Sequence, residues 1–182
     1  TARIPAYFER IVASYHGGNK NRCAHLGHWD LECSRSGSAI SIAPNPGPAD
    51  SPAAVSPKLY SASEFQAAQQ RLDDQMIRLA QMGPGQSVLD AGCGLGGLIE
   101  RINEHWSGVE LTGLNVDPEQ LEICHRIRPQ PGNSLRWLEG DACELPLDDQ
   151  IFDCVFCVEA MFHFPSRRKF LTEVLRVLKP GG

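Results

Sequence analysis

The chain has 182 residues, of which 42% are hydrophobic and 21% are charged, so it is long enough for one domain with a small appendage and can bury a core. With 17 Lys and Arg against 22 Asp and Glu, the net charge of −5 gives no general attraction to phosphate backbones or anionic lipids, and we expect no nucleic-acid partner. No uninterrupted apolar run approaches about 18 residues, so the sequence predicts no membrane span.

The first 60 residues are expected to form a helical cap that carries a Ser/Pro-rich insertion. Residues 6–15 place aromatic and branched side chains at spacings of three and four, which predicts a short amphipathic helix. Residues 34–63 are rich in Ser and Pro and carry few charges, which is typical of a loop without a core of its own.

A second helix is predicted to begin after Ser61. Ser61 and Glu64 have the spacing of a capping box, in which each residue hydrogen-bonds the backbone of the other. One apolar face is expected down to residue 83, made of Phe65, Ala68, Leu72, Met76 and Leu79.

From residue 87 onward, predicted strands and helices alternate. The strands are 87–91, 110–115, 135–138 and 152–157, and the helices are 97–106, 118–127 and one after Ser166. The inner face of the last helix is expected at Phe170, Val174, Leu175 and Leu178. This alternation predicts an α/β fold, a doubly wound parallel sheet, for residues 61–182.

The first strand runs into a glycine-rich loop with the sequence Asp90-Ala91-Gly92-Cys93-Gly94-Leu95-Gly96-Gly97. Glycines let the backbone turn sharply and approach a ligand, and the helix that follows offers amide donors, so a nucleotide-like ligand with an anionic group is expected. The letters fit both the dinucleotide pattern Gly92-x-Gly94-x-x-Gly97 and the pattern Asp-x-Gly-x-Gly-x-Gly. The loop alone does not decide between these two patterns.

Four motifs in order, over about residues 62–182, resemble the class I S-adenosylmethionine (SAM) dependent methyltransferases, which have a Rossmann-like fold. The motifs are the glycine loop, 111–121 around the end of the second strand, Gly140-Asp141-Ala142 with the segment to Asp153, and Arg176-Val177-Leu178-Lys179-Pro180-Gly181-Gly182. A dinucleotide-dependent dehydrogenase would not be expected to show the last two.

The resemblance implies SAM as the cofactor and a set of residues that bind it. It places the methionyl part at Asp90, Gly92 and Gly94, the ribose at Asn115, where most relatives have an acid, and adenine at Asp141. Asp117 fits a helix N-cap better than a ribose ligand. The full set of expected cofactor residues is Asp90, Ala91, Gly92, Cys93, Gly94, Gly96, Asn115, Val116, Gln120, Asp141, Ala142 and Val158.

The loop after the fourth strand, 158–164, faces the acceptor in this fold. Histidine side chains can take a proton from a hydroxyl group near neutral pH, so His163 is a candidate base for a hydroxyl acceptor, with a hydrogen bond inside its own loop as the alternative. Glu159 is a candidate to orient the acceptor or, equally, to cap a turn. Aromatic residues can stabilise a sulfonium or belong to the core, and the candidates are Tyr7, Tyr15, Trp29, Phe162 and Phe164.

The segment 25–30 resembles the stretch before the core in sterol, tocopherol and sugar-decorating methyltransferases, which implies a small hydrophobic acceptor. A rival interpretation is a zinc site, whose ligands would be Cys23, His25, His28 and Cys33. Structural zinc sites usually pair ligands that are further apart, so we expect no metal.

Seven cysteines at irregular spacing favour reduced thiols and a cytoplasmic protein. Cys154 and Cys157 point to opposite faces of a strand, which favours neither chelation nor a disulfide.

These observations predict a cytoplasmic SAM-dependent methyltransferase that acts on a small molecule. The resemblance implies three more strands after Gly182, so we expect a sheet that is truncated after its fourth strand. A non-catalytic, SAM-binding or partner-binding half of a larger protein is the second hypothesis, and an NAD-dependent oxidoreductase is the third. Neither the methylated atom nor homo-oligomer formation follows from the sequence.

Overall fold

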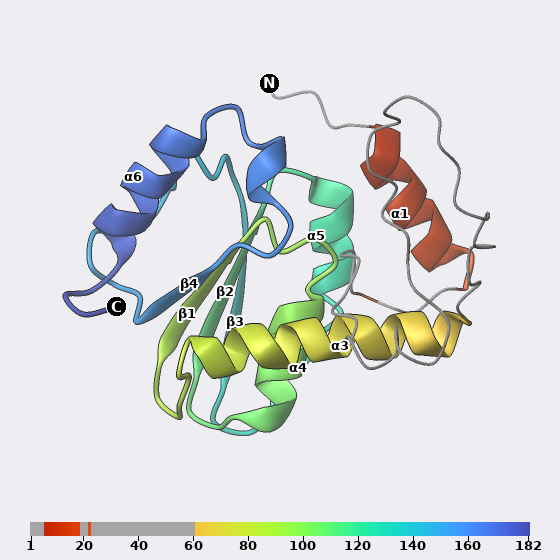
Figure 1. Cartoon of the computed structure of the whole chain (residues 1–182), viewed down its shortest axis with the longest axis horizontal. Coiled ribbons are helices and arrows are strands. Elements are labelled where there is room, and N and C mark those ends of the chain that lie inside the picture. Colours follow the sequence, from red (N-terminus) through yellow and green to blue (C-terminus); the bar gives the residue numbers. More distant parts are fainter. Residues whose placement is uncertain (1–5, 19–21, 23–60) are drawn as a thin grey trace, which may run out of the picture.

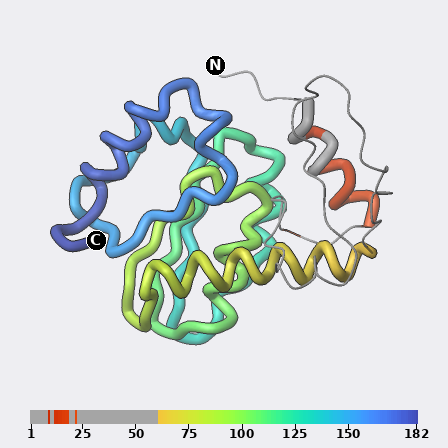
Figure 2. Tube along the Cα trace, viewed as in Figure 1, coloured from red at the N-terminus to blue at the C-terminus, as the bar shows by residue number. Residues whose placement is uncertain are grey.

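The computed structural model describes residues 6–18, 22 and 61–182 (Figure 1). Helix α1, Ala6–His16, confirms the amphipathic helix predicted near the N-terminus. The Ser/Pro-rich insertion up to residue 60, the segment 25–30 and the four residues of the alternative zinc site lie outside the described residues. The Cα trace places α1 and the C-terminal helix on opposite sides of the molecule (Figure 2).

A four-stranded parallel sheet forms the centre of the fold, in the order β3-β2-β1-β4. The strands are β1 Ser87–Ala91, β2 Glu110–Asn115, β3 Ser134–Glu139 and β4 Cys154–Phe156. This arrangement confirms the predicted α/β class and doubly wound parallel sheet. Strand β4 is shorter than the predicted 152–157, because the backbone of Phe152 pairs with Val177, the last residue of the last helix, and with Lys179 instead of with β1.

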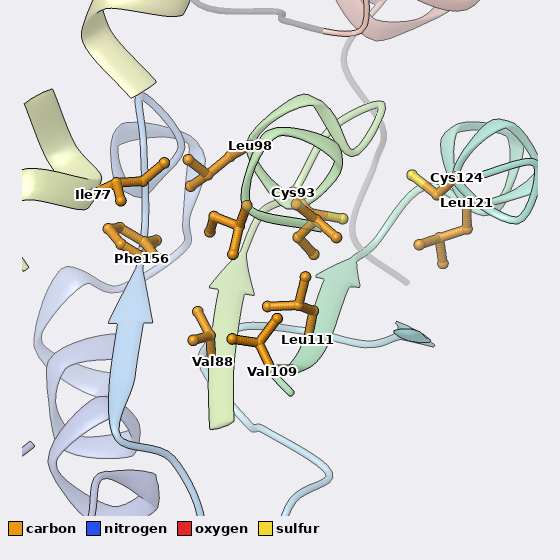
Figure 3. Close-up of a cluster of buried hydrophobic side chains, with 11 residues drawn as sticks. Ile77, Val88, Cys93, Leu98, Val109, Leu111, Leu121, Cys124 and Phe156 are labelled. Carbon is orange, nitrogen blue, oxygen red and sulfur yellow. The ribbon is translucent and has the colours of Figure 1, made fainter. Parts of the chain in front are cut away.

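Helices cover both faces of the sheet (Figure 1). One face carries α3 Ala62–Leu79, α4 Gly97–His105 and α5 Pro118–Cys124, and the other carries α6 Arg167–Val177. Successive strand residues point to opposite faces. Val88 and Leu111 therefore join Ile77 and Leu98 in the first core (Figure 3), whereas Leu89 packs with α6 in the second. Helices α4 and α5 end one and three residues earlier than predicted.

The capping box at Ser61 and Glu64 is confirmed, but the predicted inner face of α3 is partly wrong. Leu79, in the last turn, is 69% exposed. The buried side chains of this helix are Ala68, Gln69, Asp73 and Ile77. An apolar stripe shows which residues can be buried, but the elements against which the helix packs decide which ones are.

Helix α6 begins after the N-cap Ser166, whose side chain accepts a hydrogen bond from the Lys169 N–H. Its buried residues are Phe170 and Val177, whereas Leu175, predicted to face inward, is 77% exposed. In the described part of the chain, no helix is both long and apolar enough to span a membrane.

Candidate functional site

The four parallel strands end at one edge of the sheet, at Ala91, Asn115, Glu139 and Phe156. The expected cofactor residues, together with Glu159 and His163, all lie at one of these ends or in the segment that follows it, whereas the aromatic candidates Tyr7 and Tyr15 lie on α1. Ligands of doubly wound sheets bind beyond the carboxyl ends of the strands. The fold therefore brings the scattered motifs of the sequence to one edge.

The glycine loop between β1 and α4 depends on its glycines for conformation and for space. Gly92, Gly94 and Gly96 have φ values of 83°, 55° and 82°, in the left-handed region that side chains disfavour. A Cβ on Gly92 would lie 2.6 Å from the Cβ of Ala160, in the segment after β4. The glycine loop thus packs closely against the segment after β4, and any side chain at Gly92 would displace either the loop or that segment.

Asp90 is a buried carboxylate at the end of β1. It is only 3% exposed, and no hydrogen bond to its side chain comes from the residues that the structure describes. Burial, reinforced by the nearby carboxylate of Asp73, raises the pKa of Asp90 to about 7. Buried polar groups are almost always hydrogen-bonded, so an unpartnered acid with a raised pKa in a glycine loop indicates a place for a ligand donor or cation.

A chain of buried side-chain hydrogen bonds joins the end of β2 to the glycine loop. The Asp117 side chain caps α5 by accepting hydrogen bonds from the N–H groups of Glu119 and Gln120, which confirms the predicted N-cap. Its second oxygen accepts from the Gln120 Nε2 at 2.9 Å. The Asn115 Nδ2 then donates to the Gln120 Oε1 at 3.0 Å and to the Gly94 carbonyl at 3.2 Å.

Asn115 and Gln120 therefore have structural roles that the sequence did not suggest. The Asn115 Oδ1 accepts from the backbone N–H groups of Val116 and Asp117, so both ends of this amide are occupied by the protein. Gln120 is 2% exposed and is likewise bonded at both ends of its amide. This geometry favours support of the glycine loop over the direct cofactor contact that the resemblance implies for these two residues.

The residues expected around the adenine lie after β2, β3 and β4. Asp141 is exposed and accepts a hydrogen bond from the Cys143 N–H at 2.8 Å, which holds the turn after β3. Ala142 is buried, and Val116 is 37% exposed. Val158 is half-buried and packs against the first core. Their contacts with a cofactor stay predictions.

The segment that is expected to face the acceptor follows β4 and includes the short helix η1 Met161–His163. Glu159 is exposed and has a left-handed backbone, with φ of 50°. His163 is exposed, and its ring lies 4.3 Å from that of Phe162 between centroids. Phe164 packs edge-on against Phe170 in the second core. The loop thus presents one imidazole and one carboxylate at the ligand-binding edge.

The N-terminal helix docks on the glycine loop, as a small apolar cluster and one arginine show. Val12 and Tyr15 of α1 pack with Leu95 of the loop and Ile123 of α5. Arg22 donates to the carbonyl oxygens of both Leu95 and Ile123, at 3.3 and 3.0 Å. Its guanidinium lies 5.2 Å from the centroid of the Tyr15 ring. Tyr15, a candidate for a sulfonium contact, is thus 6% exposed and stacked under a protein cation.

Arg22 was not predicted as a contact of the glycine loop, and no sequence motif marks it. The pattern also gave no sign that Asp73 would be buried, because it lies among charged residues on α3. The described cysteines are all free, and within the described residues no three potential metal ligands cluster. Hydrogen bonding with Cys124, together with burial, raises the pKa of Cys93, so this loop thiol is a neutral packing group at pH 7.

Comparison with known proteins identifies the family. The family profile described as "Methyltransferase domain" matches residues 89–182, more than half of the chain. The chain belongs to this methyltransferase family. Membership decides between the two patterns that the glycine loop satisfies, in favour of a methyltransferase and against the dinucleotide-dependent oxidoreductase.

Curated relatives of this methyltransferase domain act on lipids by name. A sterol 24-C-methyltransferase of Schizosaccharomyces pombe is 33% identical over 127 residues, which cover 69% of this chain and 33% of the relative. A phthiotriol/phenolphthiotriol dimycocerosates methyltransferase of Mycobacterium tuberculosis is 40% identical over 98 residues, which cover 54% of this chain and 36% of the relative. The chain therefore spans about a third of the length of these relatives.

Solved structures confirm the class I methyltransferase fold over nearly the whole methyltransferase domain. A putative sarcosine dimethylglycine methyltransferase from Galdieria sulphuraria has a TM-score of 0.67 at 20% identity, over 97% of this chain and 57% of its own. The [4+2]-cyclase SpnF has a TM-score of 0.66 at 24% identity, over 97% and 55%. Since one of these neighbours is named as a cyclase, the fold by itself does not specify the reaction.

Proposed function

We propose that this chain binds SAM and belongs to an enzyme that transfers its methyl group to a small, lipid-like acceptor. The observation that carries the proposal is the buried Asp90, which has no hydrogen-bond partner among the described residues and lies at the start of a left-handed glycine loop. A ligand that brings a cation to this position would compensate the cost of burying the acid.

The donor set fits the amino-acid end of SAM, which carries both an ammonium and a carboxylate. Asp90 would receive the ammonium. Helix α4 begins after the N-cap Gly96, which offers no side-chain cap, so its first N–H groups suit the carboxylate. Gly92 and Gly94 allow the backbone to approach the ligand closely, and Asn115 holds the Gly94 carbonyl in place.

When bound, SAM supplies a methyl group on a sulfonium, so the chain has mainly to orient the acceptor and to manage its proton. Positioning provides much of the rate of such a transfer, and a base is needed only if the acceptor nucleophile must lose a proton. His163 is the residue that we propose for that proton, and Glu159 would orient the acceptor. Both residues follow β4, on either side of Ala160, whose Cβ would lie 2.6 Å from a Cβ added to Gly92.

A lipid-like acceptor is supported by the names of the curated relatives and by two exposed apolar side chains. Phe162 is 57% exposed and Val116 is 37% exposed, and both follow strands that end at the ligand-binding edge. Exposed apolar groups near a site favour an apolar ligand. The free thiols of the described cysteines support a reducing compartment.

The cofactor assignment is tested by calorimetric titration with S-adenosylhomocysteine, using Gly92→Ala and a matched control. Gly85→Ala is the control, because Gly85 has a similar φ of 79° but no atom within 4 Å of an added Cβ. Both substitutions carry the same backbone strain, but only Gly92→Ala is expected to abolish binding. Equal affinity of the two variants, with circular dichroism showing both folded, would contradict the assignment.

The role of His163 is tested by His163→Ala, with the exposed His125→Ala at the end of α5 as the control. With a hydroxylated acceptor, we expect turnover to fall about 100-fold or more while the cofactor affinity is unchanged. Unchanged turnover would leave His163 a structural residue, and cofactor binding without turnover of any acceptor would favour a SAM-binding half that needs another chain.

A further inference from the structure

One arginine side chain links the glycine loop to two helices of the core. The Arg22 Nη1 donates to the Leu95 carbonyl at 3.3 Å and to the Ile123 carbonyl at 3.0 Å. Its Nε forms an ion pair with the Glu100 Oε2 at 3.2 Å, and the Arg22 side chain is only 10% exposed. Leu95 belongs to the loop, Glu100 to the first turn of α4 and Ile123 to α5. Arg22 therefore holds the loop in place relative to α4 and α5.

Helix α1 encloses the same part of the loop. Its residues Val12 and Tyr15 pack with Leu95 and Ile123, so that α1 lies beside α5 (Figure 1). The Leu95 side chain is 2% exposed, and the Arg22 guanidinium lies 5.2 Å from the centroid of the Tyr15 ring. The N-terminal part of the chain therefore restrains Leu95 at both its side chain and its backbone.

Two successive carbonyl groups of the loop have side-chain donors from other segments. The Gly94 carbonyl accepts a hydrogen bond from the Asn115 Nδ2, and the Leu95 carbonyl accepts one from Arg22. In a trans peptide group the C=O and the N–H point in opposite directions. Both carbonyls are thus turned towards protein donors, and the N–H groups of the same two peptide groups, those of Leu95 and Gly96, point the opposite way.

The loop needs such restraints because of its composition. Gly92, Gly94 and Gly96 have left-handed φ values, and glycine reaches many other conformations at little cost. A carbonyl oxygen carries a partial negative charge, so a loop that turned the Leu95 carbonyl towards the site would repel the carboxylate of a ligand. The hydrogen bond from Arg22 keeps this carbonyl on the protein side.

We propose that Arg22 is a positioning residue of the cofactor site, which keeps the glycine loop in the conformation that receives the carboxylate of the cofactor's amino-acid end. This inference rests on the proposed function. Arg22 acts through the Leu95 carbonyl and does not itself touch the ligand. The N-terminal part of the chain thereby contributes to the affinity for the cofactor as well as to the packing of the fold.

The proposal predicts which part of a ligand depends on Arg22. S-adenosylhomocysteine carries the amino-acid part that the loop is expected to receive, whereas 5′-methylthioadenosine keeps the adenosine and lacks that part. Loss of Arg22 should therefore lower the affinity for the first ligand and spare the second. A merely structural role would lower the affinity for both ligands by the same factor.

The experiment is titration calorimetry of the whole chain with each of the two ligands. Arg22→Ala removes the hydrogen bonds and the ion pair, and Arg22→Lys keeps the charge but not the planar guanidinium. Arg101→Ala is the matched control, because Arg101 on α4 makes two hydrogen bonds and an ion pair with the exposed Asp74 of α3. Hydrogen exchange of a peptide that spans residues 92–99 reports on the loop itself.

We expect Arg22→Ala to weaken S-adenosylhomocysteine about tenfold or more and to change 5′-methylthioadenosine by less than about twofold. Arg22→Lys should show a smaller loss with the same selectivity, and it carries the test if Arg22→Ala does not fold. Arg101→Ala should match wild type with both ligands, and the 92–99 amides should exchange faster only in the Arg22 variants.

Equal losses for both ligands, or an unchanged affinity for S-adenosylhomocysteine in the folded Arg22 variants, would overturn the proposal. Loop amides that exchange at the wild-type rate in Arg22→Ala would overturn it as well. Failure of the wild-type chain to bind either ligand would instead refute the proposed function.

Discussion

Asn115 offers the sharpest test of how the glycine loop is held. Asn115 belongs to a series of side-chain hydrogen bonds that runs from Asp117 through Gln120 to the Gly94 carbonyl. The direction of each of these hydrogen bonds follows from Asp117, because an ionised carboxylate can only accept. The Gln120 amide must turn its Nε2 towards Asp117, so its Oε1 faces Asn115, and the Asn115 Nδ2 must donate to it and to the Gly94 carbonyl. Asn115→Asp, a change of one atom type, replaces that donor with an oxygen that faces two acceptors.

The magnitude follows from the acceptor that loses its donor. The Gln120 Oε1 is left buried without one, whereas the Gly94 carbonyl keeps the Cys124 thiol as a donor at 3.4 Å, so we expect a loss of about 1 to 3 kcal/mol in the free energy of unfolding. Rotation of the Gln120 amide does not rescue the variant, because its Oε1 would then face the Asp117 carboxylate. A proton on the new carboxyl group would restore one donor. Its pKa is therefore raised in the folded state, and the loss of stability should grow as the pH rises.

Urea denaturation followed by tryptophan fluorescence, at pH 5.5 and pH 8, measures this difference. Gln130→Glu is the control, because Gln130 is exposed and the substitution adds the same charge without removing a buried donor. The control should stay within about 0.5 kcal/mol of wild type. If Asn115→Asp is as stable at pH 8 as the control, the hydrogen-bond chain does not hold the loop and the reasoning is refuted.

Two further substitutions test the sheet and its pH dependence. Gly113→Ala would place a Cβ 2.5 Å from the Cε3 of Trp137 and should lower the free energy of unfolding in urea by about 1 to 3 kcal/mol. The control Gly83→Ala, whose added Cβ has no atom within 4 Å, should lower it far less. Equal losses in the two variants would contradict the close packing at Gly113. Hydrogen bonding to Lys179 lowers the pKa of Asp153, so its stabilisation is present above the ordinary carboxyl value of about 3.9 and is lost as the pH falls through the folded value. Asp153→Asn should lower the thermal midpoint by about 2 to 4 °C at pH 7 but not at pH 2, and a difference that persists at pH 2 would argue against this linkage.

The order and type of the core elements, and the position of the glycine loop, could be read from the amino-acid sequence. Strands β1 and β2 have the predicted bounds, because buried parallel strands are short apolar runs that turn residues delimit. The caps at Ser61 and Asp117 were equally readable, because capping depends on residues three positions apart or fewer. These are local properties of the chain.

Only the tertiary structure decided which polar residues meet. Asp73 and Gln69 are polar residues on the inner side of α3 that the hydrophobic pattern assigns to solvent, whereas Leu79 is exposed. Arg22 reaches carbonyl groups of Leu95 and Ile123, 73 and 101 residues away. Burial depends on which surfaces the fold brings together, and a hydrogen bond between distant segments depends on the positions of both. For this reason the sequence indicated the family and the edge where a ligand is expected, and the three-dimensional arrangement showed the burial of Asp73 and the hydrogen bonds of Arg22 and Asn115.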